Sequence, residues 1–385
     1  MLKIGAGAAV APFRVMDVIT AANELSRNLA PGAPGILRME VGQPGTGLPA
    51  GARQAVIAAL GANDVLGYTE AMGRLSLRRR IAAHYADWYG ISIDPARIAV
   101  TFGASGAFPL AYLAAFNPGD RIALAAPYYP PYVNIAVALG LIPVILDCGI
   151  ETGFQPTIAM LEALDTPPDG LILASPANPT GSMLSPQDLA ALTRYCHERG
   201  IRLISDEIYH GLTYGKPVAT AAAFSDSAIV INSFSKYFSM TGWRVGWMVL
   251  PEQLVRTVER LAQNFFVSPS YISQVAAEAA FDCHDELQAN RAHYENARGL
   301  MIEGLRAAGF TTFSPPDGAF YMYVSSQSRA ADSAAFCRRL LEEAGIAATP
   351  GYDFDAARGQ NYFRMSYCAA MPDIKDAISR LGRLT

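Results

Sequence analysis

Lysine and cysteine are both scarce in this chain. Only four lysines occur, at positions 3, 216, 236 and 375, although lysine and arginine together number 30. The five cysteines are scattered and form no C-x-x-C pair. This spacing excludes a disulfide framework and a zinc site of the usual pattern. We therefore expect reduced, half-buried thiols and no metal site.

The sequence also lacks an excess of positive charge, a long apolar run and internal repeats. Acidic residues number 34 and the net charge is −4, which leaves no basic field for nucleic acid or an anionic membrane. The apolar run 4–10 is interrupted by glycines, is too short to span a bilayer and precedes no cleavage site. We expect a cytoplasmic protein that acts on small soluble partners.

The order of apolar runs indicates an α/β fold. With 385 residues, the chain is long enough for one large domain and a smaller companion. Short β-branched runs alternate with helical segments from residue 98 onward, which predicts a large domain with a mostly parallel sheet flanked by helices. A smaller α+β domain is expected from the N-terminal arm and the C-terminal part. We predict an arm and loop at 1–44, a large cofactor-binding domain at 45–275 and a small domain at 276–385.

Segments outside the predicted sheet have their own patterns. Apolar residues recur at helical spacing in 14–29, which predicts an amphipathic arm. The stretch 30–51 is dense in proline and glycine and is expected to be a loop. A long helical region is expected from 269 to 307, and a last strand at 361–367.

Lys236 lies in the run Ser-Phe-Ser-Lys-Tyr-Phe-Ser, where its amine is the unusual feature. In a chain that prefers arginine, this lysine is a candidate to condense with a carbonyl as a Schiff base. The hydroxyls of Ser233 and Ser235 and the guanidinium of Arg244 suit a phosphate beside that amine. The alternative is a surface lysine with an unrelated structural arginine.

Two further candidates follow predicted strands. Residues 101–107 run from a strand through small residues into a helix, so amides near Ala104 and Ser105 are available to an anion. An ordinary glycine-rich turn is the alternative. The run 127–132 places Tyr129 where an aromatic ring can stack on a flat cofactor, with core packing as the alternative.

The next two strand ends carry an amide and a carboxylate. Asn178 lies between two prolines and can donate to an oxygen. Asp206 closes a strand and Tyr209 follows it. A strand-end carboxylate needs a cation such as a protonated pyridine nitrogen, unless it is a helix N-cap. Arg364 lies among apolar neighbours in the last strand, where a substrate carboxylate is one possible partner.

Six short motifs in this order make the chain resemble the class I/II aminotransferases, which are fold-type I pyridoxal 5′-phosphate enzymes of the aspartate aminotransferase superfamily. The resemblance extends from Phe13 to the C-terminus. The motifs are Gly-Tyr68-Thr-x-Ala-x-Gly73, Gly103-Ala-Ser-Gly, Asn178-Pro-Thr-Gly181, Asp206-Glu-Ile-Tyr209, Ser233-Phe-Ser-Lys236 with Arg244, and Phe363-Arg364-Met-Ser.

The resemblance implies roles for these residues. Lys236 would form the internal aldimine and then move the proton, while Asp206 would keep the pyridine nitrogen protonated. Tyr209 and Asn178 would hydrogen-bond the phenolate oxygen of the ring. The remaining implied roles are ring stacking by Tyr129, phosphate binding by Ala104, Ser105, Ser233, Ser235 and Arg244, phosphate binding across a homodimer interface by Tyr68, and carboxylate binding by Gly42 and Arg364.

The implied activity is exchange of an amino group between an L-amino acid and a 2-oxo acid. A lyase on the same scaffold, such as a carbon–sulfur lyase, is the alternative enzyme, and a cofactor-sensing regulator is a third reading that the net charge disfavours.

Specificity depends on the far end of the expected pocket. Some aspartate-type members have a lysine where this chain has Ser105. We therefore expect an apolar wall from Tyr128, Tyr132, Val15 and Met16. Monocarboxylic amino acids with apolar or aromatic side chains should then react at least as well as aspartate, unless Arg14 folds over the pocket.

Overall fold

A computed structural model describes residues 2–8, 10–62 and 65–384. Its largest element is a seven-stranded sheet with the order β2-β8-β7-β6-β5-β3-β4. Only β8 runs antiparallel to its neighbours, so the expected mostly parallel sheet is confirmed. The strands are β2 (Ile98–Thr101), β3 (Arg121–Ala126), β4 (Ile142–Asp147), β5 (Gly170–Ala174), β6 (Arg202–Asp206), β7 (Ile229–Ser233) and β8 (Gly246–Val249).

Both faces of this sheet are buried. Along β6, Leu203 packs into one apolar cluster and Ile204 into the other, because successive side chains of a strand point to opposite faces. Continuous apolar runs in these strands follow from this double cover. The helices on the face of Ile204 are α4 (Gly103–Ala115), α5 (Pro131–Ala138) and α8 (Glu252–Phe265), and those on the other include α3 (Leu75–Tyr89), α6 (Ile158–Glu162) and α7 (Pro186–Glu198).

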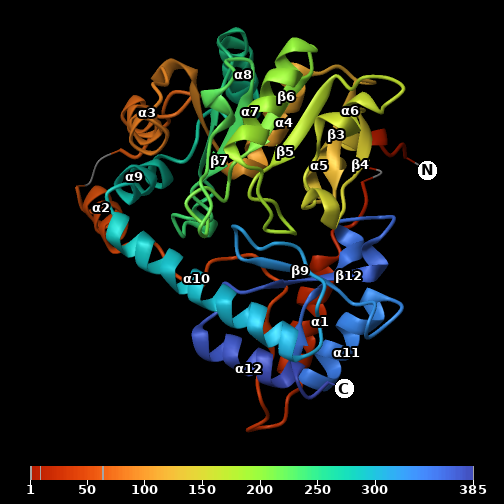
Figure 1. Cartoon of the computed structure of the whole chain (residues 1–385). Helices are drawn as coiled ribbons and strands as arrows, with labels where there is room; N and C mark the ends of the chain where they lie inside the picture. The colour runs from red at the N-terminus through yellow and green to blue at the C-terminus, as the bar shows by residue number, and fades with distance from the viewer. Residues whose placement is uncertain (1, 9, 63–64, 385) are drawn as a thin grey trace.

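A second, three-stranded sheet lies below the first in Figure 1, with the order β11-β12-β9 and antiparallel pairing. The helix α10 runs from the side of the large sheet down to this smaller one. The elements of this part are β9 (Tyr321–Ser325), β11 (Thr349–Pro350), β12 (Tyr362–Ser366), α10 (His284–Ala307), α11 (Ser333–Ala344) and α12 (Met371–Leu381).

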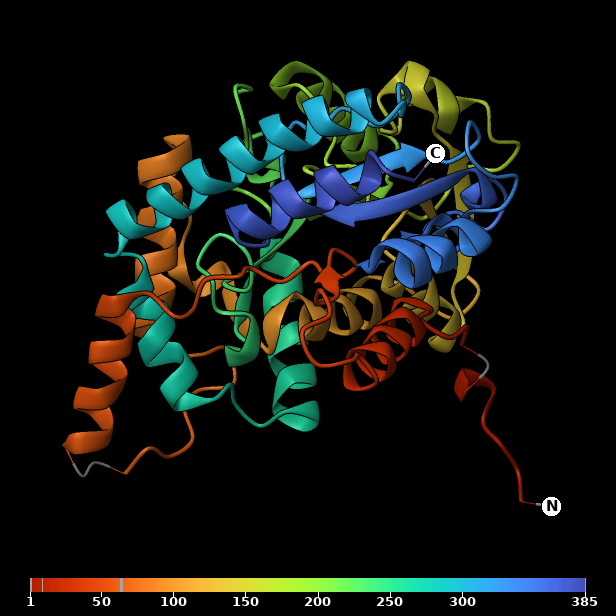
Figure 2. The same cartoon turned by 90° about the horizontal axis from the view of Figure 1, so that it is seen from below.

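The N-terminal arm belongs with the small sheet. Its helix α1 (Val15–Arg27) packs Ala22 against Leu341 of α11 and Ala347 of β10 (Ile346–Ala347). Figure 2 shows α1 beside α11 when the molecule is seen from below. The predicted helix at 14–29 is thus present.

Two local expectations were wrong. The stretch 30–51 is not all loop, because β1 (Leu37–Arg38) pairs in parallel with β10 (Ile346–Ala347), a partner 309 residues away. The helical region 269–307 is two helices, α9 (Tyr271–Ala280) and α10. Residues 281–283 separate the two helices, and the ring of Phe281 packs 4.9 Å from that of Phe238. The helix α2 (Ala50–Gly61) begins where the expected loop ends.

Among the described residues, no helix is both long enough and apolar enough to cross a membrane.

The packing of α10 gives a stability prediction. Leu305 is fully buried in the core, and its replacement by alanine should lower the free energy of unfolding by about 2–5 kcal/mol, since a cavity remains. Leu113→Ala on α4, where the side chain is 39% exposed, should cost less than about 1 kcal/mol. Urea unfolding of both variants measures this, and equal losses would contradict the assignment of Leu305 to the core.

Candidate active site

The carboxyl ends of the parallel strands meet the small sheet at a cavity of about 420 Å³. Ligand sites in open α/β sheets lie at this edge, because the strands end there and the following loops diverge. Eleven of the thirteen predicted site residues line it: Gly42, Ala104, Ser105, Tyr129, Asn178, Asp206, Tyr209, Ser235, Lys236, Arg244 and Arg364. Their individual roles stay predictions.

Lys236 follows β7 in a loop that two buried rings fix in place. Phe234 precedes Lys236 and Phe238 follows it in the sequence, and the centres of their rings lie 4.8 Å apart. The Lys236 Nζ donates to the carbonyl oxygen of Gly42 at 2.6 Å. Burial lowers the pKa of Lys236 to about 8, because the charged form loses its hydration. A substantial fraction of this amine is therefore uncharged near neutral pH, as condensation with a carbonyl requires.

Asp206 ends β6 and is completely enclosed. Its Oδ1 accepts from the amide of Ile208 at 3.1 Å and its Oδ2 accepts from the hydroxyl of Tyr132. Burial raises the pKa of Asp206 to about 6, although both hydrogen bonds oppose the rise. A cation placed beside this carboxylate would return the pKa towards its ordinary value.

The start of α4 and Arg244 together form a cradle for an anion. The first amides of a helix, here those of Ala104 and Ser105, have no acceptor within the helix and carry its positive dipole end. The guanidinium of Arg244 lies 3.4 Å from the hydroxyl oxygens of both Ser105 and Ser235. Gly103 has a φ of +66°, and a Cβ there would lie 2.8 Å from Arg244 Nη2.

Ser233 does not line the cavity, contrary to the expectation that it touches a phosphate. Its hydroxyl is buried and lies 3.0 Å from Ser235 Oγ and 3.2 Å from the carbonyl oxygen of Val245, and it accepts from the amide of Ser235 at 3.2 Å. Ser233 is the last residue of β7, so its side chain packs within the sheet. It therefore positions Ser235.

Arg364 lies in β12 and is buried among rings. Its guanidinium stacks 4.5 Å from the ring of Tyr321 and 4.7 Å from that of Phe354. Nη1 donates to Asn178 Oδ1 at 2.8 Å and Nη2 to the carbonyl oxygen of Glu40 at 2.6 Å. The buried Nε has no acceptor among the residues that the structure describes. A buried charged donor without a partner suits an incoming carboxylate.

Tyr321 is a site residue that the sequence reasoning missed. Its hydroxyl lies 2.9 Å from that of Tyr209. A Cβ at Gly42 would fall 1.7 Å from the Tyr321 oxygen, so only glycine fits there. Burial raises the pKa of both phenols, which therefore stay protonated at neutral pH. The only sequence signal was the strand around 320–324, which does not show that a side chain faces the cavity.

The aromatic run 127–132 is distributed over different environments. Tyr129 lines the cavity and meets the ring of Phe13 edge-on at 6.2 Å. Tyr132 also lines it, but its hydroxyl serves Asp206 and so it is not simply an apolar wall. Tyr128 faces a neighbouring pocket with Phe154, which contradicts its expected place in that wall.

Tyr68 lies outside the cavity and is 87% exposed. Its neighbour Thr69 donates its amide to Ser268 Oγ at 3.3 Å, which anchors this loop on the surface of the large sheet's helices. Within one chain, Tyr68 therefore contacts none of the predicted site residues that line the cavity.

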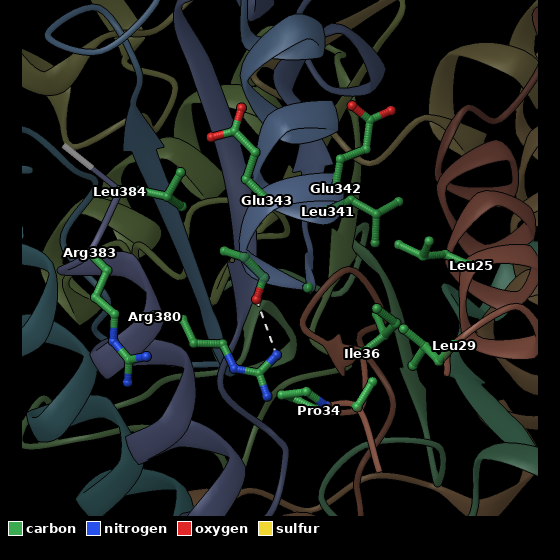
Figure 3. A pocket seen from close by; sticks show the side chains of 13 residues that line it. Leu25, Leu29, Pro34, Ile36, Leu341, Glu342, Glu343, Arg380, Arg383 and Leu384 are labelled. Carbon is green, nitrogen blue, oxygen red and sulfur yellow. Dashed lines mark hydrogen bonds between the residues drawn. The ribbon is translucent and has the colours of Figure 1, made fainter. Parts of the chain in front are cut away.

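Figure 3 shows a second cavity, of about 500 Å³, at the far end of the arm. Leu25, Ile36 and Leu341 face it, and Arg380 Nη1 donates to the carbonyl oxygen of Ala344 at 3.1 Å on its rim. It contains none of the predicted site residues. We place the chemistry in the cavity of Lys236.

Comparisons with known proteins agree with this geometry. The family model described as aminotransferase class I and II matches residues 34–381. The valine–pyruvate aminotransferase of Mycobacterium tuberculosis is 44% identical over 384 residues, which cover 99% of this chain and 98% of that one.

Two solved structures are similar throughout. A crystal structure of an aminotransferase from Mycobacterium tuberculosis has a TM-score of 0.96 at 44% identity and covers 100% of this chain and 99% of that one. The aspartate aminotransferase of Thermus thermophilus with maleate has a TM-score of 0.93 at 28% identity, with 100% of both chains covered.

The fold, the half-buried lysine, the buried carboxylate and the two arginines thus define an enzyme of amino-group transfer. The chain belongs to the class I and II aminotransferases. It exchanges an amino group between an amino acid and a 2-oxo acid, and its cofactor is pyridoxal 5′-phosphate. These relatives give no support to the lyase alternative.

The burial of Lys236 gives a prediction about its protonation. In protein prepared without cofactor, acetylation of Lys236 should accelerate as pH rises through about 8, since only the uncharged amine reacts. Mass spectrometry of peptides labelled at each pH measures this, with Lys216 on the surface as the internal reference for reagent strength. A midpoint near the ordinary value of about 10.4 would contradict the burial of the amine.

Proposed function

We propose that this enzyme takes its amino group from L-amino acids with apolar side chains, such as valine, and passes it to a small 2-oxo acid such as pyruvate. The observation that carries the proposal is the apolar lining of the cavity's far end. Phe13, Val15, Met16, Ile19 and Ile135 lie there.

No cation is available at that end for a second carboxylate. The cationic side chains that line the cavity, within the described part of the chain, are Lys236, Arg244 and Arg364. Arg14 is not among the residues that line the cavity, and its guanidinium lies 5.5 Å from the centre of the Tyr352 ring. A dicarboxylic substrate would have to bury an unpaired charge, which costs several kcal/mol.

The relatives support the same substrate class. The one named valine–pyruvate aminotransferase shares 44% of its residues with this chain, whereas the aspartate aminotransferase of Thermus thermophilus shares 28%. The substrates named for a relative with 44% identity indicate the substrate class of this enzyme, and the apolar lining of the cavity supports the same class.

The residues of the cavity fit the cofactor. The unsatisfied amides at the start of α4, with Ser105, Ser235 and Arg244, would hold its phosphate. Asp206, whose raised pKa calls for a cation, would hold the ring nitrogen as its protonated form. Tyr129 would cover the ring face. When bound, the cofactor supplies an aldehyde that links to an amine and a ring that withdraws electrons from the substrate's α-carbon.

Asn178 has an amide group with two separate tasks. Its Oδ1 accepts from Arg364, which leaves its Nδ2 hydrogens free to donate to the ring oxygen of the cofactor. Tyr209, protonated because burial raises its pKa, would donate to the same oxygen. One side chain would therefore join the site of the cofactor to that of the substrate carboxylate.

Arg364 would bind the α-carboxylate of the substrate, with the amide of Gly42 as a second donor. The Nε of Arg364, a buried donor with no acceptor among the described residues, is the group that the carboxylate would satisfy. Lys236 Nζ would then take the proton from the substrate's α-carbon, because at a pKa of about 8 it both accepts and releases a proton near neutral pH.

We further propose a homodimer in the cytoplasm. Tyr68 is nearly fully exposed beside other exposed apolar residues of the same region, Ile57, Leu60 and Val65. An exposed apolar surface of this kind is typical of a protein interface, and a second copy would bring Tyr68 to the partner's phosphate cradle. Five free thiols, four of them buried, are typical of a reducing compartment. The division at residues 44 and 275 also stays a proposal.

Single-turnover measurements with amino acids test the substrate class. Valine should convert the bound cofactor to its amine form at least about a hundredfold faster than aspartate, the factor that corresponds to several kcal/mol of unfavourable charge burial. The change in cofactor absorbance reports the conversion. Arg14→Ala should leave the ratio unchanged, and Lys236→Ala should convert neither substrate. A strong preference for aspartate that disappears in Arg14→Ala would refute the proposal.

Dilution tests the shared site. If Tyr68 reaches the partner's phosphate, Tyr68→Phe should weaken cofactor retention by about tenfold, the loss expected for one hydrogen bond to a charged group. Cofactor should also dissociate as the dimer is diluted apart. Sedimentation velocity and cofactor absorbance measure both. Thr69→Ala, next in the chain, is the control, and a fully active monomer would contradict the dimer.

A further inference from the structure

The helix α1 begins without a cap of its own. The residue before it is Arg14, whose side chain forms no capping bond, although Ser, Thr, Asp or Asn is usual at this position. The amides of a first helical turn have no acceptors within the helix. Here the carboxylate of Asp353 provides them: Oδ1 accepts from the amide of Arg14 at 2.9 Å and Oδ2 from that of Val15 at 2.7 Å.

Asp353 is itself fixed beside the substrate site. It ends a short helical turn, 351–353, in which a Cβ at Gly351 would lie 2.4 Å from the carbonyl oxygen of Gly359. The ring of the next residue, Phe354, stacks on the guanidinium of Arg364. Its carbonyl oxygen accepts a hydrogen bond from the amide of Tyr128 at 2.8 Å. The cap therefore comes from a rigid turn that also contacts the arginine of the proposed carboxylate site.

The two ends of α1 are held by different contacts. The first two turns carry Val15, Met16 and Ile19, which line the cavity. Further along, Ala22 is packed against α11, and Asn23 Oδ1 accepts from Arg38 at 2.7 Å. Loss of the cap would thus loosen the turns at the cavity and leave the rest of the helix in place.

We propose that Asp353 is a positioning residue for substrate specificity: it holds the first turn of α1 so that the arm's apolar side chains contact the side chain of the substrate. The proposal rests on the apolar substrate class given above. A substrate whose side chain ends at the β-carbon reaches the arm less than a branched one does. Asp353 therefore favours valine over alanine.

A purely structural role for Asp353 would affect all substrates alike. The ratio of kcat/KM for valine to that for alanine separates the two roles, because the contacts of both substrates with Lys236 and Arg364 are the same. Asp353→Ala should lower this ratio about tenfold, the loss expected when two methyl groups lose an apolar contact. Alanine turnover itself should change less than about twofold, since its methyl group makes little of that contact.

A second readout does not depend on catalysis. Hydrogen exchange of the amides at 14–18 should accelerate in Asp353→Ala, because those of Arg14 and Val15 lose their acceptors and the turn that they begin loosens, while exchange at 22–27 stays unchanged. Asp373→Ala is the matched control, since this exposed aspartate lies in the first turn of α12 and should change neither readout. Unchanged exchange at 14–18, or equal losses for valine and alanine, would overturn the proposal.

If Asp353→Ala does not fold, a second variant tests the proposal by removing one of the amides that donate to Asp353. Arg14→Pro removes one of the two donated amides at a φ of −64°, which proline adopts without strain, and leaves Asp353 intact. Its valine-to-alanine ratio should fall about threefold, since one of the two capping bonds is lost. Arg14→Ala keeps the amide and should match the native enzyme. Identical ratios in Arg14→Pro and Arg14→Ala would overturn the proposal.

The measurements distinguish a wrong role for Asp353 from a wrong substrate class. If native enzyme prefers aspartate to valine, the proposed function is wrong, yet faster exchange at 14–18 in Asp353→Ala would still show that Asp353 orders the arm. If valine is preferred and exchange is unchanged, only the positioning role of Asp353 is wrong.

Discussion

The placement of the Lys236 amine between the two sheets is the constraint on which the rest of the site depends. Lys236 comes from the end of β7, and the carbonyl oxygen that accepts from its Nζ, that of Gly42, comes from the segment after β1. Burial alone would make this charge costly, and it lowers the pKa to about 8. Because the lowered pKa leaves part of the amine uncharged, the same burial that makes the charge costly also makes the amine usable as a nucleophile and a base.

The small sheet and the arm complete a cavity that the large sheet only begins. Arg364 on β12 donates to Asn178, in the loop after β5, and to the backbone of Glu40, and its buried Nε has no acceptor among the described residues. Tyr321 on β9 meets Tyr209. The arm adds apolar side chains at the far end. The cavity is therefore built by the large sheet, the small sheet and the arm together.

Much of the architecture was predictable because strands buried on both faces are nearly continuous apolar runs. The strands β3, β5, β6 and β7 lie in the part from residue 98 onward where such runs alternate with helical segments. The chemistry at those ends was visible because proline, glycine, Asp206 and Lys236 interrupt the runs with residues that a plain turn does not require. The break between α9 and α10 was not visible from the apolar spacing, and the rings that Phe281 contacts there, Phe234 and Phe238, are distant in sequence.

By itself, the sequence determined which residue types stand at the strand ends, and through them the α/β class, the lysine and the likeness to the aminotransferases. Only the tertiary structure decided which side chains face the cavity. Ser233 turned into the sheet, Tyr128 turned to another pocket, and Tyr132 gave its hydroxyl to Asp206. Tyr321 and Asp353 act on partners more than 100 residues away. Such contacts depend on the packing of the two sheets and the arm, which local spacing does not encode.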